Sequence, residues 1–393
     1  MKMQKVLSTT KYTAVIFAAM VLYCVVKGFE MSSTGLYSLF LADFSIGICS
    51  RLLVGSIIGI FKDVVTREWV VGFLQVVTFA VFLVTAHYTG STFTKAEKLQ
   101  RQPLAAFVLL FIICPFSITI YAGDIFGFID VFCMILLLMT AYFCENRILI
   151  YFMPLLFVTG VFTHDCFVTG YMAPCFAILA YFVIKTYGRK LRASLIFVFS
   201  AIAGIGTTCY TVLFSRKTIR MTVEECLAHM AAKGNTTIED VSGYIEDVVL
   251  FSDVRQVAPA DAARTPANNI YYMIKYALEG LSFSELVFFI SIIPMIVLFF
   301  YIWIKAAKNS KGFFEKLPYI LFMLSAVPQL LSLVISIDFT RFLSTIIISQ
   351  TLYLFMCVRR KDEHVCSFLD KASDKAWLFF SPLLVTFLTN IFK

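Results

Sequence analysis

Two charged residues, Asp43 and Arg51, lie in an apolar stretch that reads LADFSIGICSRLLVGSIIGIF over residues 41–61. Charged side chains are costly in the hydrocarbon of a membrane, so they are rare there and are usually functional. A carboxylate can take a proton from a hydroxyl group, and an arginine fork can hold a phosphate at two points. We therefore take Asp43 as the candidate catalytic base and Arg51 as a candidate substrate-binding residue. Two plainer roles stay open: Asp43 as a helix N-cap, and Arg51 as the partner of a neighbouring acid.

Three short segments, AGDIFGFID, THDCF and SIDFTRF, each place a carboxylate where the chain turns between apolar runs. We predict that their polar residues line one cavity with Asp43 and bind the substrate; these residues are Asp124, Asp130, His164, Asp165, Asp338 and Arg341. A histidine beside a carboxylate is suited to acid–base chemistry or to phosphate contact. The alternatives are a merely solvated His164 and a local ion pair between Asp338 and Arg341, which are three residues apart.

The composition is that of an integral membrane protein. Of the 393 residues, 60% are hydrophobic, only 15% are charged and 42 are Phe, which a water-soluble domain of this length would not tolerate. The 11 Cys residues show neither disulfide nor zinc spacing. The sequence contains no Walker loop, dinucleotide-binding glycine pattern, GxSxG, HExxH or nucleic-acid motif. We therefore expect neither nucleotide-driven chemistry nor a nucleic-acid partner.

Apolar runs long enough to cross a bilayer recur along the whole chain. They predict a single all-α domain over residues 1–393, a polytopic integral membrane helical bundle of about eleven transmembrane helices. The predicted spans are 12–28, 69–88, 104–122, 126–144, 148–163, 166–185, 192–214, 286–304, 317–336, 341–358 and 376–392.

The distribution of positive charge decides whether residues 44–61 form a further span. If they do not cross, and the N-terminus is cytoplasmic, the cytoplasmic segments hold most of the 33 Lys and Arg residues. If they crossed, the basic N-terminal tail and the basic loop 185–192 would face opposite sides. We therefore predict that the loop 29–68 lies outside the cytoplasmic membrane, with 44–61 as an interfacial helix, and that the C-terminus is also outside. Gly55 and Gly59 have the GxxxG spacing that allows close packing.

A hydrophilic insertion occupies residues 215–284 on the same outer side. Its segment TVEECLAHMAAKG begins with Thr222 and Glu225 in capping-box spacing and ends at Gly234, where a helix would stop. The next segment repeats the signature with Thr236 and Glu239, and NNIYYMIKYALEG predicts a third helix. We interpret the insertion as a small helical lid on the outer face; direct participation in substrate binding is the alternative.

Three features together resemble the GT-C type of polytopic membrane glycosyltransferase, especially the bacterial membrane proteins found with surface-polysaccharide genes. They are a first outer loop with an acid and a membrane-parallel helix (ADFSIGICSRLLVGSIIG), about eleven spans with outward polar residues, and a large late outer insertion. The resemblance implies that Asp43 is the catalytic acid. It also implies a donor sugar on a polyprenyl phosphate, which is a membrane lipid, and a glycan or lipid acceptor. A divalent metal stays open as a cofactor.

Two other classes of function are compatible with this sequence. A transporter or flippase for a lipid-linked sugar would have charged residues near the middle of the membrane and broken helices. A polysaccharide polymerase, or another enzyme acting on a lipid carrier, would use the same outer cavity. Since the charges are predicted at the outer edge of the membrane, we favour the glycosyltransferase.

Overall fold

The computed structural model describes residues 2–29, 31, 34–114, 116–123, 125–245, 287, 289–335, 339–375 and 377–391. Every regular element in these ranges is a helix, which confirms the predicted all-α class. Two predicted site residues, Asp124 and Asp338, lie outside the described residues. The predicted third helix of the insertion lies outside them as well.

The described helices vary in length from single turns to 29 residues. In the first half of the chain they are α1 (Lys2–Lys27), η1 (Thr34–Phe40), α2 (Leu53–Phe61), α3 (Arg67–Lys95), α4 (Lys98–Ile113), η2 (Ile118–Ala122), α5 (Asp130–Glu145), η3 (Leu149–Phe152), α6 (Met153–Thr163), η4 (Phe167–Tyr171), α7 (Met172–Tyr181), η5 (Phe182–Thr186) and α8 (Leu191–Leu213). They continue with η6 (Ser215–Thr218), α9 (Val223–Gly234), α10 (Ile238–Ile245), α13 (Ile293–Asn309), α14 (Phe313–Leu324), α15 (Val327–Ile335), α16 (Phe339–Arg359), α17 (Glu363–Ala372), η9 (Ser373–Lys375) and α18 (Trp377–Ile391).

Six helical segments among the described residues are long and apolar enough to cross a membrane, as in a membrane protein. They are Leu7–Val26, Arg67–Lys95, Phe167–Thr186, Leu191–Leu213, Phe289–Asn309 and Thr340–Arg359. The predicted number of about eleven is not confirmed, because the other predicted spans form shorter or interrupted helices. For example, α4 ends at Ile113, before the extended Cys114 that precedes a proline. The predicted span 317–336 is divided between α14 and α15.

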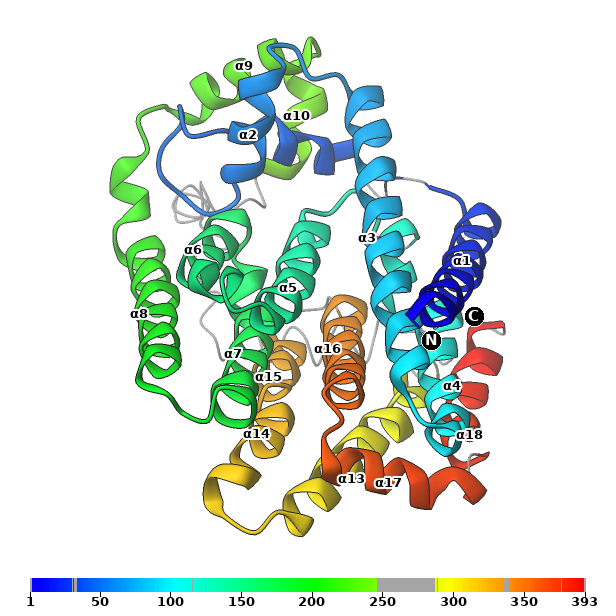
Figure 1. Cartoon of the computed structure of the whole chain (residues 1–393). Coiled ribbons are helices and arrows are strands. Elements are labelled where there is room, and N and C mark those ends of the chain that lie inside the picture. The colour runs from blue at the N-terminus through cyan, green and yellow to red at the C-terminus, as the bar shows by residue number, and fades with distance from the viewer. Residues whose placement is uncertain are drawn as a thin grey trace.

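Most of the long helices stand roughly upright, and other helices cover both ends of the bundle (Figure 1). At one end, α2, α9 and α10 lie above α5 and α6 and beside the first turns of α3; we call this the capped end. At the other, α13 and α17 cross beneath α16 and pack against each other. Among the upright helices, α1 packs on α3, α6 on α8 and α5 on α7.

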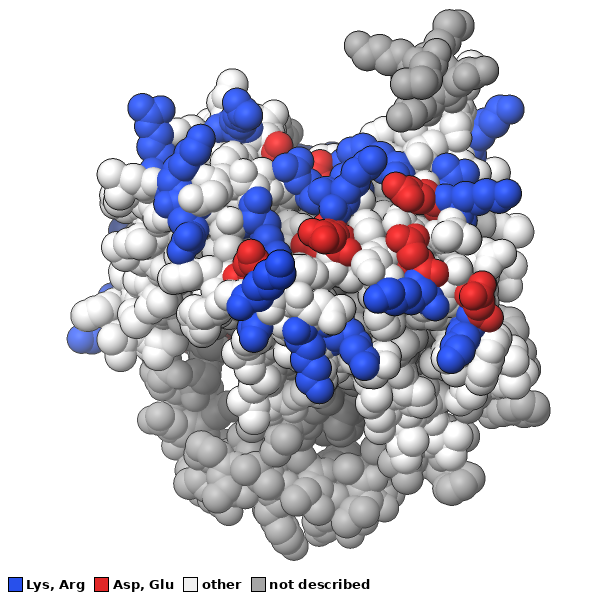
Figure 2. Space-filling model, turned by 60° about the horizontal axis from the view of Figure 1, so that its bottom comes forward, with Lys and Arg blue, Asp and Glu red and all other residues white. Residues whose placement is uncertain are grey.

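Basic side chains crowd the end opposite the cap, around a smaller number of acidic ones (Figure 2). We call this the basic end. One cavity there brings together Arg147, Lys190 and Arg360, and another brings together Lys311 and Lys371. These residues belong to loops that the positive-inside rule assigns to one side of the membrane. The tertiary structure thus gathers the loops as the charge distribution predicts.

The apolar stretch 44–61 is not one helix, and this part of the prediction is wrong. Only Leu53–Phe61 is helical, and nine residues rise about 14 Å, too short to cross a bilayer. The preceding residues form one local turn, in which Ile46 N donates to Asp43 O (3.1 Å), and otherwise bond to distant backbone: the N–H of Arg51 donates to Phe162 O (2.9 Å) and Ile46 O accepts from Arg220 N (2.9 Å). Arg51 turns the chain with a positive φ of 73°.

Candidate functional site

Asp43 lies at the capped end, in the turn between η1 and α2. Its Oδ2 atom is 2.7 Å from Lys233 Nζ and 3.3 Å from His229 Nε2. Its Oδ1 atom accepts hydrogen bonds from the backbone N–H (3.0 Å) and the hydroxyl (2.5 Å) of Ser45. The N-cap of α2 is Leu52, so the alternative that Asp43 only caps the following helix is wrong.

The helix α9 supplies both partners of the Oδ2 atom of Asp43, His229 and Lys233, because residues four apart lie on one face of a helix. The predicted capping box at its start is confirmed: Thr222 Oγ1 accepts from Glu225 N (3.2 Å), and Thr222 N donates to Glu225 (2.7 Å). The helix ends at Gly234, as predicted, with a left-handed Asn235 behind it. Backbone contacts hold this end on the first loop, since Val65 N donates to Lys233 O at 2.8 Å.

The helix α10 begins one residue away from the predicted position. Its cap is formed by Thr237 and Asp240, with Asp240 N donating to Thr237 Oγ1 at 3.3 Å, instead of by Thr236 and Glu239. Threonine side chains at both 236 and 237 can cap, and the local sequence does not distinguish them; both hydroxyls donate to Asp240. The insertion therefore places two helices on the loop that carries Asp43.

A groove of about 560 Å³ separates α2 from α9 and contains the carboxylate of Asp43. Its lining is Asp43, Phe44, Ser45, Ser56, Gly59, Ile60, Lys62, Asp63, His229, Ala232 and Lys233. Burial raises the pKa of Asp43, but hydrogen bonds from Lys233 and Ser45 outweigh this effect and lower the pKa to about 2. Asp43 is therefore an ionised acceptor at neutral pH.

The contacts of His229 define what its imidazole can do. Nε2 lies 3.3 Å from the ionised Asp43 and 3.2 Å from Ser45 Oγ. A carboxylate only accepts hydrogen bonds, so the proton belongs on Nε2 and Nδ1 is left as the acceptor. The side chain is 31% exposed and lines the groove. An ionised carboxylate that orients an imidazole is an arrangement suited to general-base catalysis.

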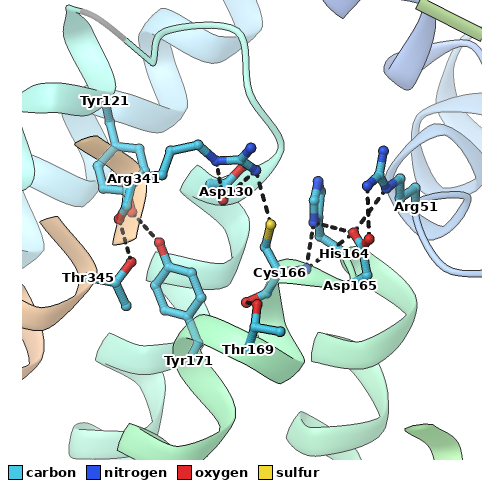
Figure 3. A network of polar contacts seen from close by, with 10 residues as sticks. All are labelled: Arg51, Tyr121, Asp130, His164, Asp165, Cys166, Thr169, Tyr171, Arg341 and Thr345. Carbon is cyan, nitrogen blue, oxygen red and sulfur yellow. Dashed lines mark hydrogen bonds and ion pairs between the residues drawn. The ribbon is translucent and has the colours of Figure 1, made fainter. Parts of the chain in front are cut away.

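A second polar cluster lies where α5, α16 and the turn after α6 meet (Figure 3); its Asp130 and His164 are buried, whereas the side chain of Asp165 is 47% exposed. Arg341, near the start of α16, donates to both oxygens of Asp130, the first residue of α5, with Nη2 at 2.8 Å from Oδ2 and 3.0 Å from Oδ1. Nη2 also lies 3.1 Å from Cys166 Sγ. The guanidinium covers the ring of Phe128 at 4.9 Å from its centroid. Arg341 therefore pairs with an acid from a distant helix.

The same cluster contains a second two-point ion pair. Arg51 donates to both oxygens of Asp165, from Nε to Oδ1 (3.0 Å) and from Nη2 to Oδ2 (2.9 Å). These contacts agree with the alternative role of Arg51 as the partner of an acid. His164 Nδ1 lies 2.7 Å from Asp165 Oδ1. Burial lowers the pKa of His164, but Cys166 and Asp165 outweigh it and raise the pKa to about 9. The imidazole is only 2% exposed, and its Nδ1 also accepts a hydrogen bond from Cys166 N at 2.8 Å.

The structure divides the predicted site residues between two places. Asp43 lies in the groove, whereas the other five described residues, Arg51, Asp130, His164, Asp165 and Arg341, form the second polar cluster (Figure 3). None of these five lines the groove. Sequence reasoning missed His229, Lys233 and Lys62. The four-residue spacing of His229 and Lys233 marks a shared helix face, but nothing local indicates that this face meets Asp43.

Three consecutive residues, His164, Asp165 and Cys166, place possible metal-ligand atoms within 4.8 Å of one another. Each of these atoms already faces a cation or a hydrogen-bond partner. Asp165 is held by Arg51, and Cys166 Sγ lies against Arg341. Since the guanidinium groups of Arg51 and Arg341 repel a divalent cation, we assign no metal to these residues.

Comparison with protein-family models, with curated proteins and with solved structures found no match.

Proposed function

We propose that this protein is a GT-C-like membrane glycosyltransferase, which transfers a sugar from a polyprenyl phosphate to a hydroxyl of a glycan or lipid acceptor. The observation that carries the proposal is the contact of Asp43 with His229 and Lys233 inside an open groove at the end of an apolar bundle. This groove offers a proton acceptor beside lysine ammonium groups, and glycosyl transfer from a phosphate needs both.

The proposed step moves one proton and one glycosyl group. His229 Nδ1 takes the proton of the acceptor hydroxyl, whose oxygen bonds to the anomeric carbon of the donor sugar. The bond from that carbon to the phosphate oxygen breaks, and its electron pair leaves with the lipid phosphate. Asp43 orients the imidazole and stabilises its protonated form. A positioned general base contributes about 10²–10⁴-fold to such a rate.

Lys62 is the cation that we assign to the departing phosphate. It lines the groove with His229, and its ammonium lies 5.6 Å from the centroid of the Trp69 ring. No ion pair joins it to another described residue. Lys233, in contrast, is engaged by Asp43 and by Gly55 O (3.1 Å). Lys62 is therefore the freer of the two ammonium groups.

The surface beside the groove supports a lipid-linked substrate. In α2, the side chains of Ile57, Ile60 and Phe61 are 47%, 76% and 83% exposed. A short helix with an apolar exposed face next to a polar groove suits the membrane interface. The carrier tail can then stay in the bilayer while its phosphate and sugar enter the groove.

The proposal includes a membrane topology. The capped end faces outward from the cytoplasmic membrane, the N-terminus is cytoplasmic and the C-terminus is outside. The shorter helices complete about eleven spans.

Reconstituted vesicles test the reaction. The full chain is incubated with radiolabelled polyprenyl-phosphate sugars and a panel of acceptors, without nucleotide sugars. We expect transfer by the native protein, its loss in His229→Gln and Asp43→Asn, and normal transfer in Glu224→Gln, which alters an exposed residue of the same helix. Full turnover in both groove variants would exclude this site.

Labelling of cysteines introduced into a cysteine-free chain tests the topology. Because Ser45 and Asp63 line one groove, an impermeant reagent should reach Ser45→Cys and Asp63→Cys from the same side. Lys311→Cys, at the basic end, should react only from the opposite side. Labelling of positions 45 and 63 from opposite sides would contradict the proposed arrangement of the first loop.

A transporter or flippase of the lipid-linked sugar is the second candidate, and the irregularity of one span favours it. The segment Phe167–Thr186 begins and ends with π-helical turns, η4 and η5, and η4 follows the buried cluster of Asp130 and Arg341. π-helical turns are frequent at functional sites, and broken helices line transport paths. The same vesicles distinguish the candidates: a flippase moves the labelled lipid between leaflets without forming a glycosylated product.

A further inference from the structure

A cavity of about 520 Å³ opens at the basic end, whereas the groove lies at the capped end. The turn after α5 contributes Arg147 to its lining, the turn before α8 contributes Lys190, and the first turn of α8 contributes Arg192. Arg360, directly after α16, completes the set. Four cations from three separate parts of the chain thus surround one space, in the region of basic side chains that Figure 2 shows.

These four cations are not neutralised by the protein. Glu145 is the only acid in the lining, and both of its carboxylate oxygens are held by Arg359, at 3.0 Å from Nε and 2.8 Å from Nη2. Within the described part of the chain, none of the four takes part in an ion pair. Like charges around one cavity repel, and a bound anion relieves that repulsion.

The helix α8 adds a second attraction for an anion. It is 23 residues long and begins at Leu191, with Lys190 as its N-cap and no side-chain hydrogen bond at the cap. Unsatisfied backbone N–H groups and the helix dipole at such a terminus favour a phosphate. The terminus lies between Lys190 and Arg192, so the two effects act on the same place.

The remaining lining indicates that the anion carries hydrocarbon. Ile150 and Tyr151 of η3 and Ile196 of α8 form the apolar part of the cavity wall. Beyond it, the packed helices α6 and α8 present exposed apolar side chains, including Leu155 (61%), Phe199 (56%) and Ile202 (63%). Apolar surface of this kind faces lipid in a membrane-spanning bundle. A free phosphate would leave this apolar wall without a partner.

We propose that this cavity binds the headgroup of an anionic phospholipid, with its phosphate among Arg147, Lys190, Arg192 and Arg360 and its acyl chains along α6 and α8. Basic pockets between membrane helices hold anionic headgroups in this way, and the leaflet beside a basic end is the anionic one. The site is independent of the groove and of the reaction proposed there.

Lipid binding by the purified full chain tests the proposal. The protein is placed in detergent with phosphatidylcholine, and binding of phosphatidylglycerol is measured by native mass spectrometry. We expect Arg147→Gln/Lys190→Gln/Arg192→Gln/Arg360→Gln to bind phosphatidylglycerol about tenfold or more weakly than the native chain, since each cation near the headgroup contributes to its attraction. The matched control Lys98→Gln/Lys305→Gln/Lys308→Gln/Lys316→Gln removes as many charges outside the cavity and should bind within about twofold of native.

Two further measurements distinguish a lipid bound in this cavity from general charge attraction and from a free-anion site. The double variant Arg147→Gln/Arg192→Gln, which retains half of the cations, should show an intermediate loss if the cavity is the site. Millimolar inorganic phosphate should not displace the bound lipid. Equal loss in the control and the quadruple variant would overturn the proposal in favour of general charge attraction, and displacement by phosphate alone would overturn it in favour of a free-anion site.

Discussion

The guanidinium of Arg341 lies 2.8 Å from the carboxylate of Asp130, although 211 residues separate them in the chain. The contact joins the first turns of α5 and α16. The side chain of Asp130 is only 4% exposed and that of Arg341 is 11% exposed. A buried ion pair stabilises a fold weakly, because both charges lose hydration, but the loss of one partner leaves an uncompensated charge.

We therefore expect Asp130→Leu to destabilise the protein by about 3–5 kcal/mol. The double variant Asp130→Leu/Arg341→Met should recover most of that loss, since it removes both charges. Urea unfolding in detergent of the native chain, both single variants and the double variant completes the cycle. Additive losses in the double variant would show that the two residues do not act as a pair.

A second prediction concerns the protonation of Asp43. Burial raises its pKa, but Lys233 and Ser45 lower it to about 2, so the carboxylate becomes protonated only as the pH falls towards that value. Lys233→Met removes the strongest stabilising contact and should raise the pKa of Asp43. The titration of the Asp43 carboxyl, followed by infrared difference spectroscopy with Asp43→Asn as the reference, should then move to higher pH.

The control for this experiment is Lys98→Met, which removes a lysine at the start of α4, away from the groove. The titration of Asp43 in this variant should coincide with that in the native protein. An unchanged titration of Asp43 in Lys233→Met would contradict the role of Lys233 in holding this carboxylate ionised.

The raised pKa of His164 gives stability a defined pH dependence. Its pKa is raised to about 9 in the folded protein, from the ordinary histidine value of 6.5. The folded state therefore binds more protons than the unfolded state between these values, and its stability falls as the pH rises. The contribution is complete below about pH 6.5 and is lost as the pH passes about 9.

Thermal unfolding from pH 6 to pH 10 measures this effect. The native protein should lose stability across the interval, whereas His164→Gln should show a flatter curve, because glutamine does not titrate. Asp165 remains ionised throughout, since its pKa is held well below the usual range: burial raises it, but His164 and Arg51 outweigh burial. Parallel curves for the two proteins would contradict the role of His164.

The last prediction tests the close crossing of α2 and the end of η1. A Cβ atom at Gly55 would lie 2.0 Å from the carbonyl oxygen of Ala42, the residue before Asp43. Gly55→Ala must therefore move the backbone beside the groove, and we expect a lower melting temperature and weaker activity. Gly72→Ala is the control, since its Cβ meets no atom within 4 Å. Alanine favours a helix over glycine by about 1 kcal/mol, so this control should be as stable as the native chain or more so.

Part of the fold follows directly from local sequence. Apolar runs predict helices of membrane-spanning type, and the capping box of Thr222 and Glu225 marks the start of α9 within one residue. The basic loops indicate which segments share one end of the molecule. Such features depend on residues close in the chain, or on a charge count, and are readable without tertiary contacts.

The breaks in the helices and the composition of the site were decided by tertiary structure. The stretch 44–52 is apolar enough for a helix, yet its backbone bonds to residues near 162 and 220 instead. Lys233 meets Asp43 across 190 residues, and Arg341 meets Asp130 across 211. The sequence by itself determined that Asp43, Asp130 and Arg341 are charges placed in apolar surroundings. The partner of each charge depended on the packing of distant helices. An ion pair forms between groups that are close in space, and it requires no particular separation in the sequence.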